Sequence, residues 1–306
     1  AFAQTSFEVK VHNVTQDIPA LNVPVTLQIF ENDVEIQRFE IDSDSKGNAK
    51  FNLEIPQTGS FTVMASALYK KVRYFSDSQF VSLDQLTYLV LNIYDPTRNK
   101  QSISISSESA IIFQQLQKDS LLHVVQITTF ENSSEQSFIG TDDNKQSVLN
   151  IPLPPMAFDV QNVSDPGSLE FDPLTNQLYS TVPALPGINE VVISYKCLYT
   201  GDSYMWSKTF PYPYQNIVVA LPSRFTINEN NGWESTSIEN LDDESYTKYS
   251  LTGKSSDSGL LITNLPLSEG SQSKILQESV RIITVWSTII IALLLILSFI
   301  IRNRLR

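Results

Sequence analysis

Apolar and polar residues alternate along most of the first 95 residues of the chain. In the segments 7–11, 23–29 and 61–65 every second residue is apolar, and residues typical of turns separate these segments. Alternation with a period of two predicts β-strands with one buried face. The strands are spaced about ten residues apart without an amphipathic helix between them, and a last strand is expected at 86–94. We therefore predict an antiparallel β-sandwich over residues 6–95.

A second strand-rich region follows a short linker at 95–100. Its turns are rich in proline, as at 152–155 and 183–187. Proline suits turns and sheet edges because it cannot donate a backbone hydrogen bond. We predict a second antiparallel β-sandwich over 101–266. Its strands are expected at 102–113, 120–130, 147–153, 190–199, 204–210, 216–221, 246–251 and 259–265.

The longest uniform signal is the apolar segment 282–301. It holds twenty residues without a charge, and twenty residues of α-helix rise about 30 Å, the thickness of the hydrocarbon core of a bilayer. We predict a transmembrane helix in the lipid bilayer, preceded by a serine-rich linker at 267–281; a buried core helix is the alternative. The predicted fold class is all-β, with two tandem antiparallel β-sandwich domains followed by one C-terminal transmembrane α-helix.

Basic residues set the expected orientation of this helix. Three arginines lie in the tail, 302–306, and only Arg281 directly precedes the helix. Because positive charge collects on the cytoplasmic side of a membrane, we expect the tail in the cytoplasm and residues 1–280 outside, in the periplasm or the extracellular space. The first three residues match the A-x-A end of a cleaved signal peptide. Residues 1–5 are therefore expected to be a signal-peptide remnant and N-terminal tail.

Charge and residue usage exclude several classes of function. The chain has 33 acidic and 21 basic residues and a net charge of −12, and such a surface repels nucleic acid. Cys197 is the only cysteine, so no internal disulfide is expected, and alternation places it on one face with Ile193 and Tyr195. We interpret Cys197 as a core residue. Only two histidines occur, His12, expected to face outward, and His123, which fits either face; we predict no metal site and no cofactor.

Short acidic motifs are the other candidates for cation binding. The run 42–53 starts like a calcium loop, but Lys46 and Leu53 occupy its fifth and twelfth positions, where oxygen ligands are required. We interpret this run as a hairpin turn. The clusters 142–144 and 242–244 are either weak cation sites or solvated loops. The sequence has no G-x-S-x-G elbow and no glycine-rich phosphate loop, so we predict that the protein is not an enzyme.

One part of the chain resembles a known family. The segment 42–53, followed by 59–69, is similar to the carboxypeptidase-regulatory-like, transthyretin-like β-sandwich. In that family a strand ends in a T-D-x-x-G turn, and a G-x-Y-x-V strand follows. Here Asp44-Ser-Lys-Gly47 fills the turn and Phe61 replaces the tyrosine. The resemblance covers the first 95 residues and implies a non-catalytic module, often an adhesion or spacer unit.

Aromatic side chains form the main predicted contact with a partner. Prolines around them favour a sheet edge, and aromatic residues are enriched in interface cores; packing in the domain's own core is the alternative. In the predicted helix, two threonines one turn apart would hydrogen-bond a partner's transmembrane helix, unless the helix is only a tether. The predicted contact residues are Tyr204, Trp206, Phe210, Tyr212, Tyr214, Thr284 and Thr288.

These observations favour a non-enzymatic function. We expect a membrane-anchored extracytoplasmic interaction protein that serves as an accessory subunit of a larger membrane or envelope complex. The alternative is a surface receptor or adhesin that binds a peptide, glycan or calcium through sandwich edges and loops. The proline-rich pattern at 151–222 resembles membrane-anchored bacterial proteins that carry the regulatory-like module in front. A lumenal module of a eukaryotic endoplasmic-reticulum membrane complex is the other interpretation.

Overall fold

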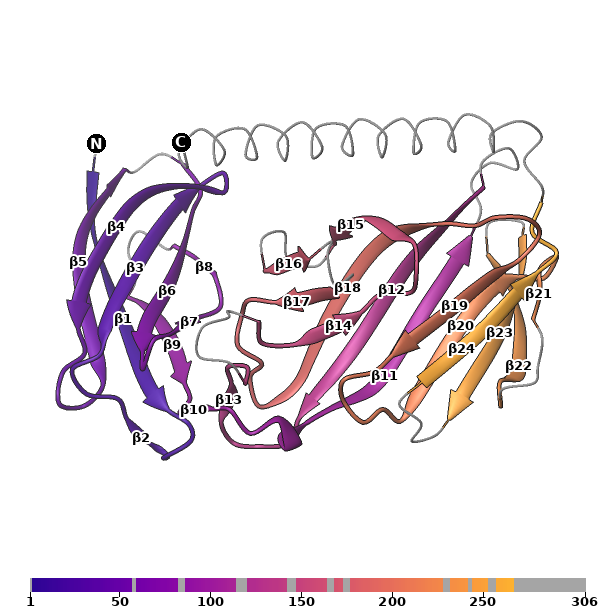
Figure 1. Cartoon of the computed structure of the whole chain (residues 1–306). Coiled ribbons are helices and arrows are strands. Elements are labelled where there is room, and N and C mark those ends of the chain that lie inside the picture. Colours follow the sequence, from indigo (N-terminus) through magenta and orange to yellow (C-terminus); the bar gives the residue numbers. More distant parts are fainter. Residues whose placement is uncertain are drawn as a thin grey trace, which may run out of the picture.

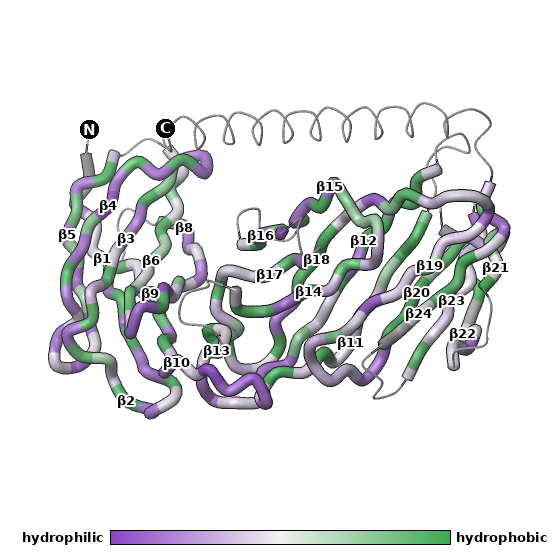
Figure 2. The backbone as a smooth tube through the Cα atoms, in the orientation of Figure 1, coloured by the Kyte–Doolittle hydropathy of each residue, from purple (hydrophilic) through white to green (hydrophobic). Residues whose placement is uncertain are grey.

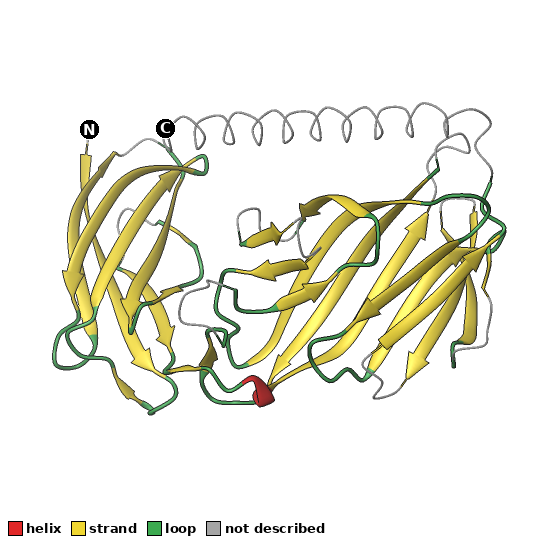
Figure 3. Cartoon of the chain, viewed as in Figure 1, coloured by secondary structure: helices red, strands yellow, loops and turns green. Residues whose placement is uncertain are grey.

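β-Strands make up nearly all of the regular structure (Figure 3). The only helix in the described residues is a short 3₁₀ turn, η1 (Lys100–Ser102). The computed structural model describes residues 2–56, 59–81, 86–113, 120–141, 147–163, 168–172, 177–227, 232–241, 244–252 and 257–266. The chain is therefore all-β over these ranges, as the alternation predicts.

The predicted membrane anchor is not among these residues. The linker 267–281, the helix 282–301 with Thr284 and Thr288, and the tail 302–306 all lie outside the described ranges. None of the described helical structure is long and apolar enough to cross a bilayer.

Two sheets enclose the hydrophobic core of the N-terminal region (Figure 1). In one sheet β1 pairs with β2, β5 and β9, and in the other the order is β4-β3-β6-β7 with β8 also paired to β6. Both sheets contribute buried residues to one continuous cluster. The strands are β1 (Phe2–Asn13), β2 (Ile18–Pro19), β3 (Pro24–Glu31), β4 (Val34–Asp42), β5 (Asn48–Pro56), β6 (Phe61–Tyr69), β7 (Val72–Phe75), β8 (Gln79–Phe80) and β9 (Thr87–Ile93).

The predicted inward faces of these strands are confirmed. Figure 2 shows apolar and polar residues alternating along the strands of this region. The alternate apolar residues of 7–11, 23–29 and 61–65 are all buried, as is expected when one face of a strand packs on a core.

Two details of the N-terminal prediction are corrected. β9 pairs with β1 in parallel, so the sheet is mixed rather than antiparallel. Alternation reports that one face is buried but carries no information about strand direction. In addition, β1 begins at Phe2, because residues 2–5 of the predicted tail pair with 53–56 of β5.

The acidic run at 42–47 is a turn, as interpreted from the sequence. Asp44 Oδ1 accepts hydrogen bonds from the backbone N–H groups of Lys46 (2.7 Å) and Asn48 (2.9 Å), so this carboxylate is used to close the turn. Gly47 has φ +78°, and a Cβ there would lie 2.6 Å from the Val11 carbonyl oxygen. Only glycine fits this conformation and this space.

The second region is built on a seven-stranded sheet with the order β15-β18-β12-β11-β20-β23-β22. Two three-stranded sheets, β14-β17-β16 and β19-β24-β21, cover one of its faces, and Figure 1 shows them in front of the long strands. The strands are β10 (Pro96–Thr97), β11 (Ile103–Phe113), β12 (Leu121–Asn132), β13 (Ser137–Phe138), β14 (Asn150–Pro152), β15 (Ala157–Asn162), β16 (Leu169–Asp172), β17 (Gln177–Ser180), β18 (Gly187–Leu198), β19 (Tyr204–Thr209), β20 (Asn216–Pro222), β21 (Thr226–Ile227), β22 (Glu234–Leu241), β23 (Glu244–Thr252) and β24 (Asp257–Thr263).

A second hydrophobic cluster lies between these sheets. β11 pairs with β20 in parallel, so this sheet is also mixed, contrary to the antiparallel prediction. The sequence analysis did not predict β15, β16, β17 or β22. β15, β16 and β17 are only six, four and four residues long, and several residues of β22 are exposed, so each gives only a short period-two pattern in the sequence.

The segment 95–100, predicted to be a linker, takes part in the contact between the two regions. β10 pairs in parallel with β13. The Thr15 hydroxyl donates to the Glu135 carbonyl (2.7 Å), and the Tyr74 hydroxyl lies 3.1 Å from Ser137 Oγ. Hydrogen bonds from Thr15 and Tyr74 of the N-terminal region, together with the β10–β13 pairing, therefore reach the start of the second region.

Asp95 lies on the N-terminal side of this junction, and its backbone carbonyl accepts a hydrogen bond from the Ser137 N–H (3.0 Å). Its carboxylate accepts hydrogen bonds from Lys70 (2.7 Å), Gln16 (2.8 Å), Tyr69 (2.8 Å) and Asn13 (3.4 Å). Partial burial by itself favours the neutral acid, but these donors outweigh it and lower the pKa of Asp95 to about 2. The carboxylate is therefore charged and fully hydrogen-bonded at neutral pH.

Two isoleucines of β18 provide a matched test of the proposed core. Ile193 is 0% exposed, whereas Ile188 on the same strand is 64% exposed. Ile193→Ala should lower the free energy of unfolding by about 2–5 kcal/mol through lost burial and a residual cavity. Ile188→Ala should change it by less than about 0.5 kcal/mol. Chemical denaturation of both variants measures the difference, and equal losses would contradict the assigned inward face.

Candidate functional site

The aromatic residues predicted to contact a partner lie in the core of this chain. Tyr204, Trp206, Phe210, Tyr212 and Tyr214 are each no more than 7% exposed. This corrects the prediction, because their side chains present no surface to another protein. The edge position is confirmed for β19, which is the outer strand of its three-stranded sheet in the described ranges. Alternation turns the aromatic side chains of this edge strand inward.

Cys197 is buried, as predicted from its place in the alternating strand. Its side chain is inaccessible, and the surrounding core includes Ile193 and Tyr195 from the same face of β18. Burial raises the pKa of the thiol to about 11 and outweighs the opposite effects of Tyr204 and Lys208. A thiol that stays protonated at neutral pH is a poor nucleophile.

The two histidines differ in their surroundings. His12 is partly exposed on β1, and its Nε2 lies 3.1 Å from Asp17 Oδ1. This agrees with the predicted outward face. His123 stacks on the ring of Phe113 with centroids 5.5 Å apart, on the face of the seven-stranded sheet opposite to the core.

A group of polar side chains lies inside the second hydrophobic cluster. We call it the buried polar centre, and it consists of Glu108, Gln126, Thr128, Tyr195 and Lys208. Lys208 Nζ donates to Glu108 Oε1 (2.8 Å) and contacts Gln126 Oε1. Gln126 Nε2 donates to Glu108 Oε2 (3.2 Å) and to Thr128 Oγ1 (2.9 Å), and the Tyr195 hydroxyl donates to Gln126 Oε1 (3.1 Å).

This centre is closed to solvent. The side chains of Lys208 and Glu108 are both 0% exposed. Burial lowers the pKa of Lys208, because a low-dielectric interior disfavours the ammonium, while the Glu108 carboxylate opposes this effect. The indole of Trp206 lies 4.5 Å from the Lys208 nitrogen and offers a cation–π contact. No substrate can reach these groups without opening the sheets.

The strand pattern explains how charged residues reach the core. β19 alternates so that Lys208 shares the inward face with Tyr204 and Trp206. In β11 the pairing with β12 shifts between Ile105 and Ser107. This β-bulge changes which residues face inward, and Glu108 consequently enters the core beside Thr128, its partner in the β11–β12 register.

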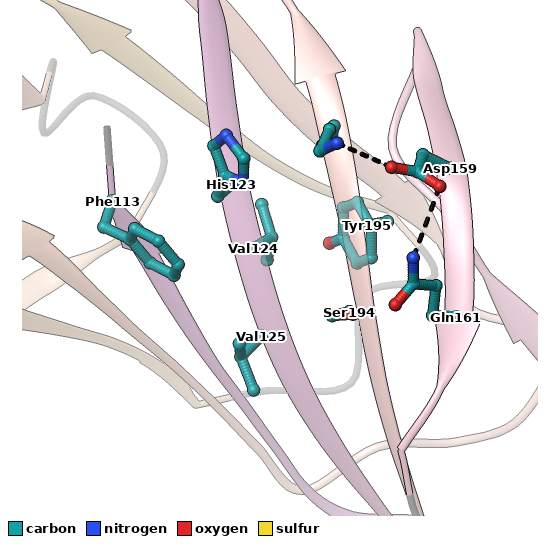
Figure 4. Close-up of a pocket in the computed structure, with 9 residues that line it drawn as sticks. Phe113, His123, Val124, Val125, Asp159, Gln161, Ser194 and Tyr195 are labelled. Carbon is teal, nitrogen blue, oxygen red and sulfur yellow. Dashed lines mark hydrogen bonds and ion pairs between the residues drawn. The ribbon is translucent and has the colours of Figure 1, made fainter. Parts of the chain in front are cut away.

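An open pocket lies on the opposite face of the seven-stranded sheet, which we call the outer face (Figure 4). It has a volume of about 230 Å³ and lies over β11, β12, β18 and β15. Its lining residues are Phe113, His123, Val124, Val125, Asp159, Gln161, Ser194, Tyr195 and Lys196.

The edge strand β15 forms one wall of this pocket. Its register with β18 shifts between Phe158 and Gln161, and Asp159 has φ +51°, so a bulge aims the Asp159 side chain at β18. Lys196 Nζ lies 2.6 Å from Asp159 Oδ2, and Gln161 also donates to this carboxylate (Figure 4). The hydrogen bonds from Lys196 and then Gln161 lower the pKa of Asp159. The pocket thus combines a charged pair and an amide with an aromatic wall.

Neither place forms a metal site. No group of three or more histidine, cysteine, aspartate or glutamate side chains suitable for a metal ion occurs in the part of the chain that the structure describes. The acidic cluster 142–144 lies outside that part, as do residues 242 and 243 of the other acidic cluster.

Comparison with known proteins does not identify the chain. No family model matches it, and no curated protein matches it. Among solved structures, an M1 zinc metallopeptidase from Deinococcus radiodurans is similar at 9% sequence identity and a TM-score of 0.34, over 53% of this chain and 42% of that chain. A mutant of that peptidase bound to a Tyr-Ser-Ala substrate gives 8% identity over the same shares, also at 0.34.

The chain therefore spans less than half of these structures, and a TM-score of 0.34 carries no argument about its fold or activity. The sequence itself lacks the H-E-x-x-H motif of zinc metalloproteases, because its two histidines, His12 and His123, lie far apart.

The reactivity of the single cysteine, Cys197, measures whether the core around it is closed to solvent. Because Cys197 is buried and its pKa is raised to about 11, a maleimide reagent at pH 7 should leave the folded protein unmodified. The same reagent should modify one thiol per chain in denaturant. Intact mass spectrometry reports both results, and rapid labelling of the folded protein would contradict the assigned packing.

Proposed function

We propose that the protein is a non-enzymatic, membrane-anchored extracytoplasmic interaction protein and serves as an accessory subunit of a larger membrane or envelope complex. In this proposal two β-sandwiches stand on the transmembrane helix 282–301. The apolar, uncharged sequence of that segment and the arginines behind it support the anchor and its orientation. The resemblance of the first 95 residues to the regulatory-like module supports a non-catalytic role.

The observation that carries the interaction function is the apolar outer face of the seven-stranded sheet. Ile111 is 39% exposed and Ile127 is 38% exposed. Ile111 pairs with Val125, and Ile127 pairs with Val192, so these side chains adjoin across three strands. Phe158 extends the same surface beside the pocket. We call these five residues the outer-face patch. Adjoining exposed apolar side chains next to polar ones are typical of protein-binding surfaces.

The charged side chains of the buried polar centre and of the pocket are paired with one another, and this supports a non-catalytic role. Its charged buried residues, Lys208 and Glu108, are closed to solvent and cannot meet a diffusing substrate. In the pocket, the carboxylate of Asp159 is already paired with Lys196. Because these charged groups already have partners within the chain, they support a binding function rather than a catalytic one.

The pocket also favours a second candidate function, recognition of a small ligand such as a glycan or a peptide side chain. It places the amide of Gln161 and the Asp159–Lys196 pair beside the ring of Phe113. Binding sites commonly combine an apolar wall with a few oriented polar groups. This second candidate corresponds to the surface receptor or adhesin, a function that does not require a stable protein partner.

Co-purification tests the subunit proposal. The full chain extracted from its native membrane in mild detergent should bring down one protein in stoichiometric amount. The double variant Ile111→Lys with Ile127→Lys places two charges in the outer-face patch and should lower recovery of that protein at least about tenfold, since desolvating unpaired charge in an interface costs several kcal/mol.

The control is Ile238→Lys, which changes an isoleucine that is 70% exposed on β22, away from the patch. It should co-purify as the parent does, and all variants should keep the parent melting temperature. A partner retained equally by the double variant removes the outer-face patch from the interface. A chain without any stoichiometric protein favours the receptor function.

Labelling of intact cells tests the proposed topology. Ile238→Cys adds a thiol at an exposed position of the proposed outer domain, and the native Cys197 is buried. Asn303→Cys adds a thiol to the proposed cytoplasmic tail. A membrane-impermeant maleimide should label the first variant in sealed cells and the second only after permeabilisation. Labelling of the tail alone in sealed cells would reverse the orientation.

A further inference from the structure

Three groups that can react with one another meet in the buried polar centre. Lys208 provides a primary amine, Gln126 a carboxamide and Glu108 a carboxylate. The amine contacts the Gln126 carboxamide oxygen and lies 2.8 Å from Glu108 Oε1. The other carboxylate oxygen, Glu108 Oε2, accepts a hydrogen bond from Gln126 Nε2 at 3.2 Å. One oxygen of Glu108 therefore faces the attacking nitrogen and the other faces the leaving nitrogen.

We infer that Lys208 and Gln126 become joined by an intramolecular isopeptide bond, formed by the folded protein itself with Glu108 as the proton carrier. The bond would connect Lys208 Nζ to Gln126 Cδ and would release the carboxamide nitrogen. No cofactor, oxidant or second protein is required, because the acyl donor and the nucleophile are both side chains of this chain.

The reaction balances as an acyl transfer. Lys208 first gives a proton to Glu108, and the neutral amine then attacks Gln126 Cδ, so that a C–N bond forms and the carbonyl electron pair moves to oxygen. The attacking nitrogen loses a second proton as this oxygen re-forms the carbonyl and the original C–N bond breaks. Both protons pass through Glu108 to the departing nitrogen, which leaves as ammonium, and Glu108 returns to its carboxylate form.

The surroundings favour each step. Tyr195 donates to Gln126 Oε1 at 3.1 Å, the atom on which negative charge develops during attack. The Trp206 indole in turn donates to the Tyr195 hydroxyl at 3.4 Å and fixes its position. Burial also favours the neutral, nucleophilic form of Lys208. Exclusion of water removes the competing nucleophile.

The position of the bond gives it a structural consequence. Gln126 lies on β12 of the seven-stranded sheet and Lys208 on β19 of a three-stranded sheet, and 82 positions of sequence separate them. The bond would therefore add a covalent link between two sheets that are held together by side-chain packing and by side-chain hydrogen bonds such as Lys208–Glu108. A covalent tie between facing sheets opposes their separation by heat or by a pulling force.

Intact mass spectrometry of the purified full-length chain tests this inference without any substitution. We expect a mass lower than that of the sequence by one ammonia, and after proteolysis a branched peptide that contains both Gln126 and Lys208. Full-length protein at the unmodified mass would overturn the inference. A branched peptide through a different lysine would also overturn it.

Matched variants distinguish a loss of bond formation from a general disturbance of the core. Glu108→Gln keeps the size and hydrogen-bonding capacity of the side chain but removes the proton carrier, so this variant should stay at the unmodified mass. Lys208→Arg removes the nucleophile and should give the same result. Lys10→Arg, at an exposed position of β1 in the N-terminal region, should form the bond as the parent does. A cross-link that forms at the parental level in folded Glu108→Gln would remove Glu108 from the mechanism.

Discussion

The ammonium group of Lys208, before any bond to Gln126 forms, is the most demanding constraint on the folding of the second region. A buried ammonium is stable only when its charge is matched and its hydrogens find acceptors, because its desolvation costs several kcal/mol. Glu108 provides the opposite charge from β11, Gln126 an acceptor from β12, and Trp206 a π-face from β19 itself. Tyr195 of β18 completes the network through Gln126. Three adjacent strands of the large sheet, β18, β12 and β11, and the edge strand β19 of a small sheet must therefore keep fixed positions for the Lys208 nitrogen to keep its partners.

The period-two pattern was enough to predict the all-β character of the described residues and most inward faces, because burial of one strand face leaves a direct trace in the sequence. Val9 and Val25 illustrate this, since each lies at a predicted inward position and is fully buried. Strand direction leaves no such trace, and the parallel pairings of β1 with β9 and of β11 with β20 were consequently missed. The bulged edge strand β15 was missed for a related reason. Its pairing is interrupted between Phe158 and Gln161, and the strand is only six residues long, so its period-two pattern is too short to stand out from the surrounding loops.

The buried polar centre was only partly visible in the sequence. Lys208 lies two residues after Trp206 in an alternating strand, so the pattern alone places a lysine on an inward face. Gln126 likewise alternates with Val124 and Leu122. Two features hid the signal. The neighbours of Gln126, Val125 and Ile127, are also apolar, and thus the inward face of β12 was ambiguous. The bulge after Ile105 also changes the inward set of β11, so a uniform alternation does not place Glu108 inside. The contact between these residues depends on tertiary pairing, which a single sequence does not encode locally.

The ambiguity in β12 also shows what the polar centre does for the whole sheet. A one-residue slip of a strand exchanges its two faces. In β12 such a slip would place Val125 and Ile127 in the core, and hydrophobic burial alone would discriminate weakly against it because these side chains suit an apolar interior. It would, however, remove Gln126 from Lys208 and leave a buried ammonium without one of its acceptors, at a cost of about 1–3 kcal/mol. The same register sets which side chains form the outer face, where Val125 and Lys196 line the pocket. The polar residues inside the sheet therefore determine the position of the apolar surface outside it.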